Sequence, residues 1–225
     1  MNQGTRDEML DHLVGAVGSV AVAHPTRVAI DGAPASGKTT LADELAALLR
    51  EGGREVIRAT IDDFLVPRAQ RYARGEYSAE GCYFDAHDYQ ALNRVLLDPL
   101  GPGGDRRFQR AVYDRATDSV LLPPVMSASV DAVLVFDGVF LMRPELYDRW
   151  DLRIFVSTAP EATVARAVVR DHRVSSRSDV ERRWRERYIP SQRLYFKNDR
   201  PTLRANIIVH NDHPQLPAWD AQYDN

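Results

Sequence analysis

The stretch GAPASGKT, from Gly32 to Thr39, fits the pattern G-x-x-x-x-G-K-[ST] at every fixed position. The glycines of this pattern let the backbone curl so that successive N–H groups face phosphate oxygens. Lys38 would then reach the β- and γ-phosphates, and the Thr39 hydroxyl would bind Mg²⁺. The segment predicts a phosphate-binding loop, the P-loop, with ATP and Mg²⁺ as cofactors. Its nucleotide-binding residues are Gly32, Ala33, Pro34, Ala35, Ser36, Gly37, Lys38, Thr39 and Thr40.

The residues on either side of the P-loop have the patterns of a strand and a helix. Arg27–Asp31 is a short apolar run, and residues 39–50 carry leucines at helical spacing before Gly52 and Gly53 end the helix. Residues 55–61 are expected to form the next strand. This strand–turn–helix–strand order begins a βαβ unit and predicts a parallel sheet with a right-handed crossover.

Three further apolar runs, Ala132–Phe136, Leu152–Val156 and Asn206–Val209, predict the other strands. Residues 62–130 contain many prolines and glycines, and we interpret them as a substrate-side insertion within one domain, residues 1–225. The expected fold is α/β: a P-loop NTPase three-layer sandwich whose five-stranded parallel sheet has helices on both faces. Helices are expected at residues 6–23, 86–97, 160–170 and 178–197, and a short hairpin near residues 106–122.

The composition excludes several classes of protein. The 29 basic and 32 acidic side chains give a net charge of only −3, which offers no reason to expect nucleic acid or an anionic membrane as partner. Cys82 is the only cysteine, so an internal disulfide and a Cys-rich metal site are excluded. The longest apolar stretch, residues 13–23, is shorter than the ~20 residues of a membrane span, and the N-terminus does not resemble a signal peptide. We interpret the chain as cytoplasmic.

Polar residues end three of the expected strands, as Asp31-Gly32, Asp62-Asp63 and Asp137-Gly138. Ligands of such sheets bind at the carboxyl ends of the strands. Asp62 would take the proton of an attacking hydroxyl or bind Mg²⁺, and Asp137 would face the metal. The alternatives are a helix N-cap for Asp62 and a turn-forming Asp-Gly for Asp137. No N-K-x-D tetrapeptide of the GTPase type occurs, which favours a small-molecule kinase.

Several motifs occur together in a recognisable order. They are Gly32–Thr39, Asp62-Asp63-Phe64, Phe84-Asp85-x-x-Asp88, Val112-Tyr113-Asp114, Phe136-Asp137-Gly138, Arg166–Asp171, Arg187–Pro190 and Ala205–Ile208. In this order and spacing the chain resembles the uridine kinase family, which is related to phosphoribulokinase and pantothenate kinase. The resemblance covers about residues 27–210. It implies a nucleoside kinase fold with an arginine-bearing lid at residues 166–190, and phosphorylation of the 5′-hydroxyl of a nucleoside such as uridine or cytidine.

The resemblance also implies roles for individual residues. Asp62 corresponds to the catalytic base, Asp85 to the carboxylate that binds the ribose hydroxyls, and Phe84 and Tyr113 to walls of the nucleoside pocket. The implied catalytic residues are Lys38, Asp62 and Arg170; the lid arginines facing the phosphates are Arg170, Arg173 and Arg177; the metal-binding residues are Thr39, Asp62 and Asp137. The implied substrate-binding residues are Asp62, Phe64, Phe84, Asp85, His87, Tyr113, Arg166 and Arg187.

The sequence departs from the family where the base is recognised. Asp118 occupies the position of a histidine that reads the pyrimidine, and Arg187 the position of a glutamine near the base. His87 could equally cap a helix. For Arg166, Arg182, Arg183 and Arg185 the residue pattern itself favours a solvated helix face. The expected partner is a nucleoside-like small molecule. The sequence does not distinguish this acceptor from another nucleoside, a pantothenate-like acid or a sugar phosphate. It also leaves open a regulator without transfer chemistry, and a homo-oligomer.

Overall fold

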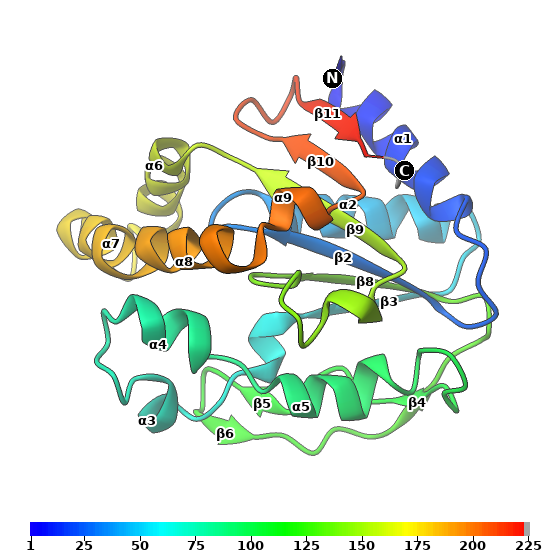
Figure 1. The fold of residues 1–225 in the computed structure, drawn as a ribbon, viewed down its shortest axis with the longest axis horizontal. Coiled ribbons are helices and arrows are strands. Elements are labelled where there is room, and N and C mark those ends of the chain that lie inside the picture. The colour runs from blue at the N-terminus through cyan, green and yellow to red at the C-terminus, as the bar shows by residue number, and fades with distance from the viewer. Residues whose placement is uncertain (223–225) are drawn as a thin grey trace.

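The computed structural model describes residues 1–222, so residues 223–225 of the predicted domain lie outside the described residues. Its central feature is a seven-stranded sheet (Figure 1). In spatial order the strands are β1 (Asn2–Gln3), β11 (Ala218–Ala221), β10 (Ile207–His210), β9 (Leu152–Ser157), β2 (Thr26–Gly32), β8 (Val133–Gly138) and β3 (Val56–Thr60). The five strands from β10 to β3 are parallel, as predicted.

The two additional strands extend the sheet beyond β10, where β11 pairs antiparallel with both β10 and β1. Strand β1 has two residues and β11 has four, of which only Trp219 is buried. Such short segments show no clear hydrophobic alternation, which is the signal that identifies a strand from sequence.

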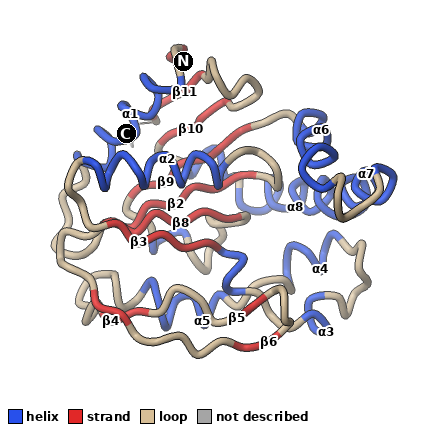
Figure 2. The backbone as a smooth tube through the Cα atoms, turned by 180° about the vertical axis from the view of Figure 1, so that it is seen from behind, coloured by secondary structure: helices blue, strands red, loops and turns tan. Residues whose placement is uncertain are grey.

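Helices cover both faces of the sheet, which confirms the three-layer sandwich. Helices α1 (Arg6–Gly18) and α2 (Lys38–Glu51) pack on one face, and Figure 2 shows α2 lying across the strands on that side. Alternate residues of β2 enter the two cores: Val28 and Ile30 pack with α1 and α2, whereas Ala29 faces the opposite core. The remaining helices are α3 (Arg68–Arg71), α4 (Ala79–Phe84), α5 (Tyr89–Leu92), α6 (Pro160–Asp171), α7 (Arg177–Arg183), α8 (Ile189–Asp199) and α9 (Pro201–Arg204).

Several predicted elements have different bounds in the structure. The first helix ends at Gly18 rather than at residue 23, because the Ser19 hydroxyl donates to the Gly15 carbonyl at 2.8 Å and closes the last turn. The helix expected at residues 86–97 consists of α5 followed by a π-helical segment, Asn93–Leu97. The basic helix expected at 178–197 is α7 and α8 joined by a second π-helical segment, Trp184–Tyr188.

The hairpin predicted near residues 106–122 corresponds to two separate antiparallel ribbons. Strand β5 (Tyr113–Asp114) pairs with β6 (Ser119–Val120), and β4 (Arg107–Phe108) pairs with the more distant β7 (Met126–Ser127). Short 3₁₀ turns occur at Ile61–Phe64 and Tyr147–Arg149. Within residues 1–222, none of the helices combines the length and apolar character needed to cross a membrane.

The register of the sheet brings the tips of three strands to one level. Asp137 of β8 lies opposite Ile30 of β2 on one side and Thr60 of β3 on the other. The next residues along the chain are therefore the start of the P-loop after β2 and the turn that carries Asp62 after β3. Strand pairing alone thus places the start of the P-loop, Asp137 and Asp62 at one edge of the sheet.

A buried carboxylate ties this edge together. Asp31 has no exposed surface; its side chain accepts hydrogen bonds from the Gly32 N–H at 2.7 Å, the Leu141 N–H at 3.2 Å and the Tyr195 hydroxyl. Burial raises the pKa of Asp31 to about 6, although these hydrogen bonds and the Lys38 ammonium act in the opposite direction. Asp31 therefore joins β2, the segment after β8 and α8, and has a structural role.

The raised pKa of Asp31 predicts a specific dependence of stability on pH. Between about pH 4 and pH 6 the folded chain holds a proton that the unfolded chain releases, so rising pH destabilises the folded state. At about 1.4 kcal/mol per pH unit, the free energy of unfolding of the wild type relative to Asp31→Asn should fall by roughly 2–3 kcal/mol across this range. Urea unfolding of both proteins at several pH values measures the difference; a difference independent of pH would contradict this assignment.

Candidate active site

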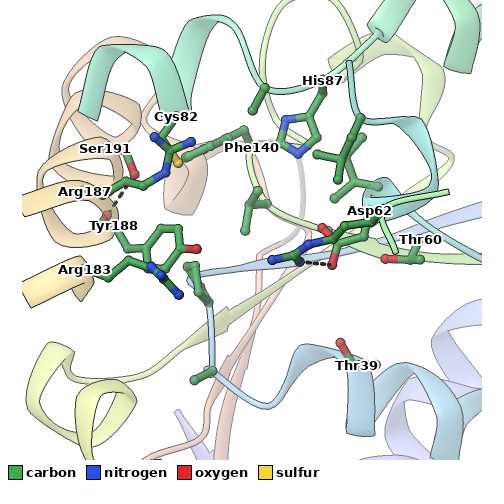
Figure 3. Close-up of a pocket in the computed structure, with 18 of the residues that line it drawn as sticks. Thr39, Thr60, Asp62, Cys82, His87, Phe140, Arg183, Arg187, Tyr188 and Ser191 are labelled. Atoms are coloured by element: carbon green, nitrogen blue, oxygen red, sulfur yellow. Dashed lines mark hydrogen bonds and ion pairs between the residues drawn. The ribbon is translucent and has the colours of Figure 1, made fainter. Parts of the chain in front are cut away.

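A cavity of about 440 Å³ opens where the tips of β3 and β8 meet the P-loop (Figure 3). Its walls come from the P-loop, the 3₁₀ turn after β3, the segment around α3 and α4, and the helical segment from α6 to α8. The predicted site residues that line it are Pro34, Ala35, Lys38, Thr39, Asp62, His87, Asp137, Arg170 and Arg187. The cavity therefore joins the predicted phosphate site to part of the predicted acceptor site.

The P-loop needs its glycines because other backbone atoms approach it closely. Gly37 has φ +95°, a conformation that side chains rarely adopt, and an added Cβ would lie 2.4 Å from Asn211 Nδ2. A Cβ on Gly32 would lie 2.7 Å from the Val156 carbonyl oxygen. Because glycine has no Cβ, these two positions let the loop lie against β9 and the segment after β10.

The back of the P-loop is held by three hydrogen bonds to one carbonyl oxygen. The Ser36 carbonyl accepts from Asn211 Nδ2 at 2.7 Å, Thr158 Oγ1 at 3.1 Å and Arg166 Nη1 at 3.1 Å. Arg166 also donates to the Asn211 carbonyl at 2.6 Å. The structure thus places Arg166 behind the loop and outside the cavity, neither on a solvated face nor beside the acceptor.

Thr39 and Asp137 form the group that is suited to a metal ion. The Thr39 hydroxyl donates to one carboxylate oxygen of Asp137 at 2.6 Å, and Arg58 Nη2 lies 2.7 Å from the other. Arg58, which sequence analysis missed, also pairs with Asp43 at 2.8 Å. Hydroxyl and carboxylate oxygens fit Mg²⁺, which protein sites commonly bind through one or two carboxylates together with substrate phosphates. Within residues 1–222, no cluster of three or more His, Cys, Asp or Glu side chains is arranged to hold a metal ion.

Lys38 lies among the carboxylates at the strand tips. Burial lowers the pKa of its ammonium group, and the charges of Asp137, Asp62 and Asp31 oppose that shift. Its Nζ donates to the Ala33 carbonyl within the loop at 3.4 Å. A triphosphate at this position would add negative charge and favour the protonated form of Lys38.

Asp62 is accessible from the cavity, whereas the adjacent Asp63 does not line it. The Asp62 side chain is 60% exposed and lies 3.9 Å from Arg115 Nη1. Burial raises the pKa of Asp63, and the Asp62 and Asp137 charges raise it further. Of the two neighbouring carboxylates, Asp62 is therefore the one that can meet an incoming hydroxyl.

Besides Arg166, four of the predicted acceptor residues lie outside the cavity lining. Phe64 is fully buried in the core, with its ring centroid 6.2 Å from that of Phe136. Tyr113 is buried and its hydroxyl bonds to Asp118, the residue at the family's histidine position. Asp85 pairs with Arg74 at 2.6 Å.

Phe84, the fourth of these residues, is 48% exposed and stacks edge-on against Tyr83, with the ring centroids 4.6 Å apart. The acceptor wall that the resemblance implies is therefore only partly present, because these side chains have partners elsewhere.

The P-loop also contributes only part of its length to the cavity. Five of its nine predicted positions lie outside the lining: Gly32, Ala33, Ser36, Gly37 and Thr40.

The proposed lid contributes some of its arginines to the cavity and not others. Arg170 of α6 lines the cavity and its Nε lies 2.7 Å from Asp171 Oδ1. Arg173 and Arg177 are exposed and outside it, and Arg177 pairs with Glu181 at 2.7 Å. Arg183, expected on a solvated face, lines the cavity instead.

The π-helical segment brings two residues into the site that the sequence pattern does not mark. Trp184 and Tyr188 line the cavity together with Arg187, because the wider turn changes which side chains share a face of the helix. Arg71, the last residue of α3, and Tyr72, which follows it, line the cavity as well. No periodic signal in the sequence marks any of these positions, although such π-helical segments occur frequently at functional sites.

The hydrogen bonds of Arg166 predict that it supports nucleotide binding. Arg166→Gln should weaken the binding of Mg·AMP-PNP by about tenfold, because two carbonyls that shape the loop lose charged donors. The control is Arg182→Gln, since Arg182 is exposed and pairs with Glu186. Calorimetry measures both affinities. An unchanged nucleotide affinity with a raised KM for the acceptor would favour the substrate role implied by the resemblance.

Comparison with known proteins gives a consistent result. A uridine kinase from Ureaplasma urealyticum serovar 10 is 24% identical over 197 residues, which cover 85% of this chain and 91% of that protein. Uridine-cytidine kinase B from Dictyostelium discoideum is 29% identical over 149 residues, which cover 66% of this chain and 59% of that protein. A solved structure of a possible uridine kinase from Bacillus stearothermophilus has a TM-score of 0.69 at 25% identity, with 90% of this chain and 97% of that chain covered.

The profile of the Phosphoribulokinase / Uridine kinase family matches residues 28–209, which include β3, β8 and β9, most of β2 and β10, and every residue that lines the cavity. The match agrees with the P-loop geometry and with the order of the parallel strands. The chain belongs to the phosphoribulokinase/uridine kinase family of P-loop kinases.

Proposed function

We propose that this chain transfers the γ-phosphoryl group of Mg·ATP to a hydroxyl group of a small molecule. The observation that supports this most strongly is that Lys38, Thr39, Asp137 and Asp62 line one cavity. A regulator without transfer chemistry would have no need of an accessible carboxylate beside the phosphate site. Phosphoryl transfer depends mainly on positioning and on neutralising charge, and these residues supply both.

In this proposal Asp62 accepts the proton of the acceptor hydroxyl as its oxygen attacks the γ-phosphorus. The bond to the β,γ-bridging oxygen breaks, and the products are the phosphate ester and ADP. Lys38 and Arg170 neutralise charge on the transferring group. The negative charge of Asp62 raises the pKa of both side chains and so favours their charged forms. Thr39 and Asp137 would hold Mg²⁺, which supplies further neutralisation when bound. Residues 166–190 would close over the phosphates as a lid and exclude water.

The acceptor that the relatives favour is a nucleoside, phosphorylated at its 5′-hydroxyl. Two of them are named as kinases of uridine or of uridine and cytidine, at identities of 24% and 29%. A second candidate acceptor is a small alcohol that carries an acidic group. The observation that favours it is the number of arginines in the cavity: Arg71, Arg115, Arg170, Arg183 and Arg187.

The proposed base can be tested by comparing two adjacent carboxylates. A panel of nucleosides, hydroxy acids and sugar phosphates, assayed by coupled detection of ADP, identifies the best acceptor. With it, Asp62→Asn should lower kcat by about 10²–10⁴-fold, because no group then takes the hydroxyl proton. Asp63→Asn is the matched control and should change kcat little, since Asp63 does not line the cavity. Equal losses in the two variants, or a change in KM alone, would refute the role of Asp62 as a base.

A further inference from the structure

Two buried arginines line the acceptor side of the cavity. Arg71 is the last residue of α3 and is 6% exposed, and Arg187 lies in the π-helical segment and is 4% exposed. Both guanidinium groups contact the ring of Tyr72, at 5.4 Å and 4.9 Å from its centroid. Segments more than a hundred residues apart in the chain thus bring two positive charges to one ring. In Figure 3, Arg187 lies across the cavity from Asp62.

The hydrogen bonds that both arginines donate to the backbone go to neutral carbonyl groups. Arg71 donates to the Val66 carbonyl at 3.1 Å, and Arg187 donates to the Glu76 and Ser78 carbonyls at 2.8 Å and 3.2 Å. Among residues 1–222, neither guanidinium forms an ion pair with a carboxylate. A guanidinium group has five N–H donors in a fixed plane, so each arginine keeps donors for a further acceptor.

The carboxylates that line the cavity are associated with other cations. Asp171 pairs with Arg170, and Asp62 lies 3.9 Å from Arg115. Asp137, the third, pairs with Arg58. Arg183 at the rim lies 3.6 Å from the Glu76 carboxylate. The positive charge of Arg71 and Arg187 is therefore not neutralised within this part of the molecule.

An uncharged histidine lines the same cavity as the two arginines. His87 lines the cavity, and its Nδ1 is buried without a hydrogen-bond partner among the described residues. The pKa of His87 is lowered to about 4, chiefly by burial; the Asp62 carboxylate opposes this shift, and the Arg143, Arg71 and Arg187 charges contribute to it. His87 is thus neutral at physiological pH, and its ring can exchange a hydrogen bond with a ligand.

Burying a cation without a counter-ion is costly, and the carbonyl bonds and the contact with Tyr72 offset this cost only in part. An anionic ligand would offset it further, because guanidinium groups bind carboxylate and phosphate oxygens through paired hydrogen bonds. We propose that Arg71 and Arg187 form an anion subsite that binds the carboxylate or phosphate of the acceptor alcohol while its hydroxyl meets Asp62. The inference rests on the phosphotransferase function proposed above. It assigns an acidic alcohol rather than a neutral nucleoside as substrate.

The subsite can be tested without knowing the substrate, by using small ions as probes. Mg·AMP-PNP is first bound at saturation, so that the P-loop and the γ-phosphate position are filled. Inorganic phosphate and acetate are then titrated separately in a calorimeter, with acetamide as the neutral counterpart of acetate. We expect phosphate or acetate to bind with a Kd below about 10 mM, and acetamide not to bind. Tighter binding of phosphate indicates a phosphorylated acceptor, and tighter binding of acetate a hydroxy acid.

Variants then show whether these two arginines hold the probe. Arg71→Gln and Arg187→Gln should each weaken the binding of the anion at least tenfold, and Arg187→Lys, which keeps the charge, should weaken it less. The matched control is Arg149→Gln, because Arg149 is surface-exposed, pairs with Asp98 and lies outside the cavity. A merely structural role of Arg187 would instead lower the affinity for Mg·AMP-PNP or the melting temperature without a selective effect on the anion.

The possible failures of the two proposals are distinguishable. If Mg·AMP-PNP itself does not bind, the proposed phosphotransferase function fails. If it binds but neither anion does, or if the anion binds equally well to both glutamine variants, the anion subsite is refuted and the transfer chemistry stands. Equal binding of acetate and acetamide would also refute the subsite, because it would show that charge is not recognised.

Discussion

The hydrogen bond from the Thr39 hydroxyl to Asp137 connects the two parts on which this site depends. Thr39 lies in the first turn of the helix that follows the P-loop, and Asp137 lies at the end of β8. Arg58, from β3 on the other side, holds the second oxygen of the same carboxylate. The phosphate loop and two neighbouring strand tips thus share one buried carboxylate. An ion bound there would lie beside both the nucleotide phosphates and the turn that carries Asp62.

Hydrogen bonds from the rest of the fold hold this arrangement from behind. Asp31 fixes the start of the P-loop to the segment after β8 and to α8 through Tyr195. The Ser36 carbonyl, bound by donors that include Arg166 and Asn211, fixes the back of the loop to α6 and to the end of β10. Helix α6 carries both Arg166, which supports the loop, and Arg170, which lines the cavity. A movement of that helix would change the shape of both.

The sequence was most informative where chemistry restricts the backbone. The spacing of Gly32, Gly37, Lys38 and Thr39 predicts a loop that only glycine can build, and the structure shows the close contacts that require it. The buried parallel strands were also predictable, because such strands are nearly continuous apolar runs. Asp62 and Asp137 followed from the rule that ligands bind at the carboxyl ends of parallel strands, since that rule depends on topology rather than on side-chain detail.

The acceptor side was less predictable because its residues come from irregular segments. The resemblance placed Tyr113 and Asp85 in the substrate pocket, but Asp118 and Arg74 bond to them here, and these partners are not visible as a pattern. Arg187 was singled out by its position. The contact of Arg187 with Tyr72, however, depends on a π-helical turn that no propensity scale identifies. Where local sequence leaves several conformations open, tertiary contacts decide which side chains meet a ligand.

The central claim is that the P-loop and the Asp137 carboxylate together bind a metal–nucleotide complex. Calorimetric titration of AMP-PNP with and without Mg²⁺, on the wild type and on Thr39→Val, tests it most directly. The account predicts that Mg²⁺ strengthens binding to the wild type by about tenfold or more and that Thr39→Val loses most of this gain, because it lacks the hydroxyl oxygen. A wild type that binds no nucleotide, or an affinity that Mg²⁺ does not change, would contradict the account.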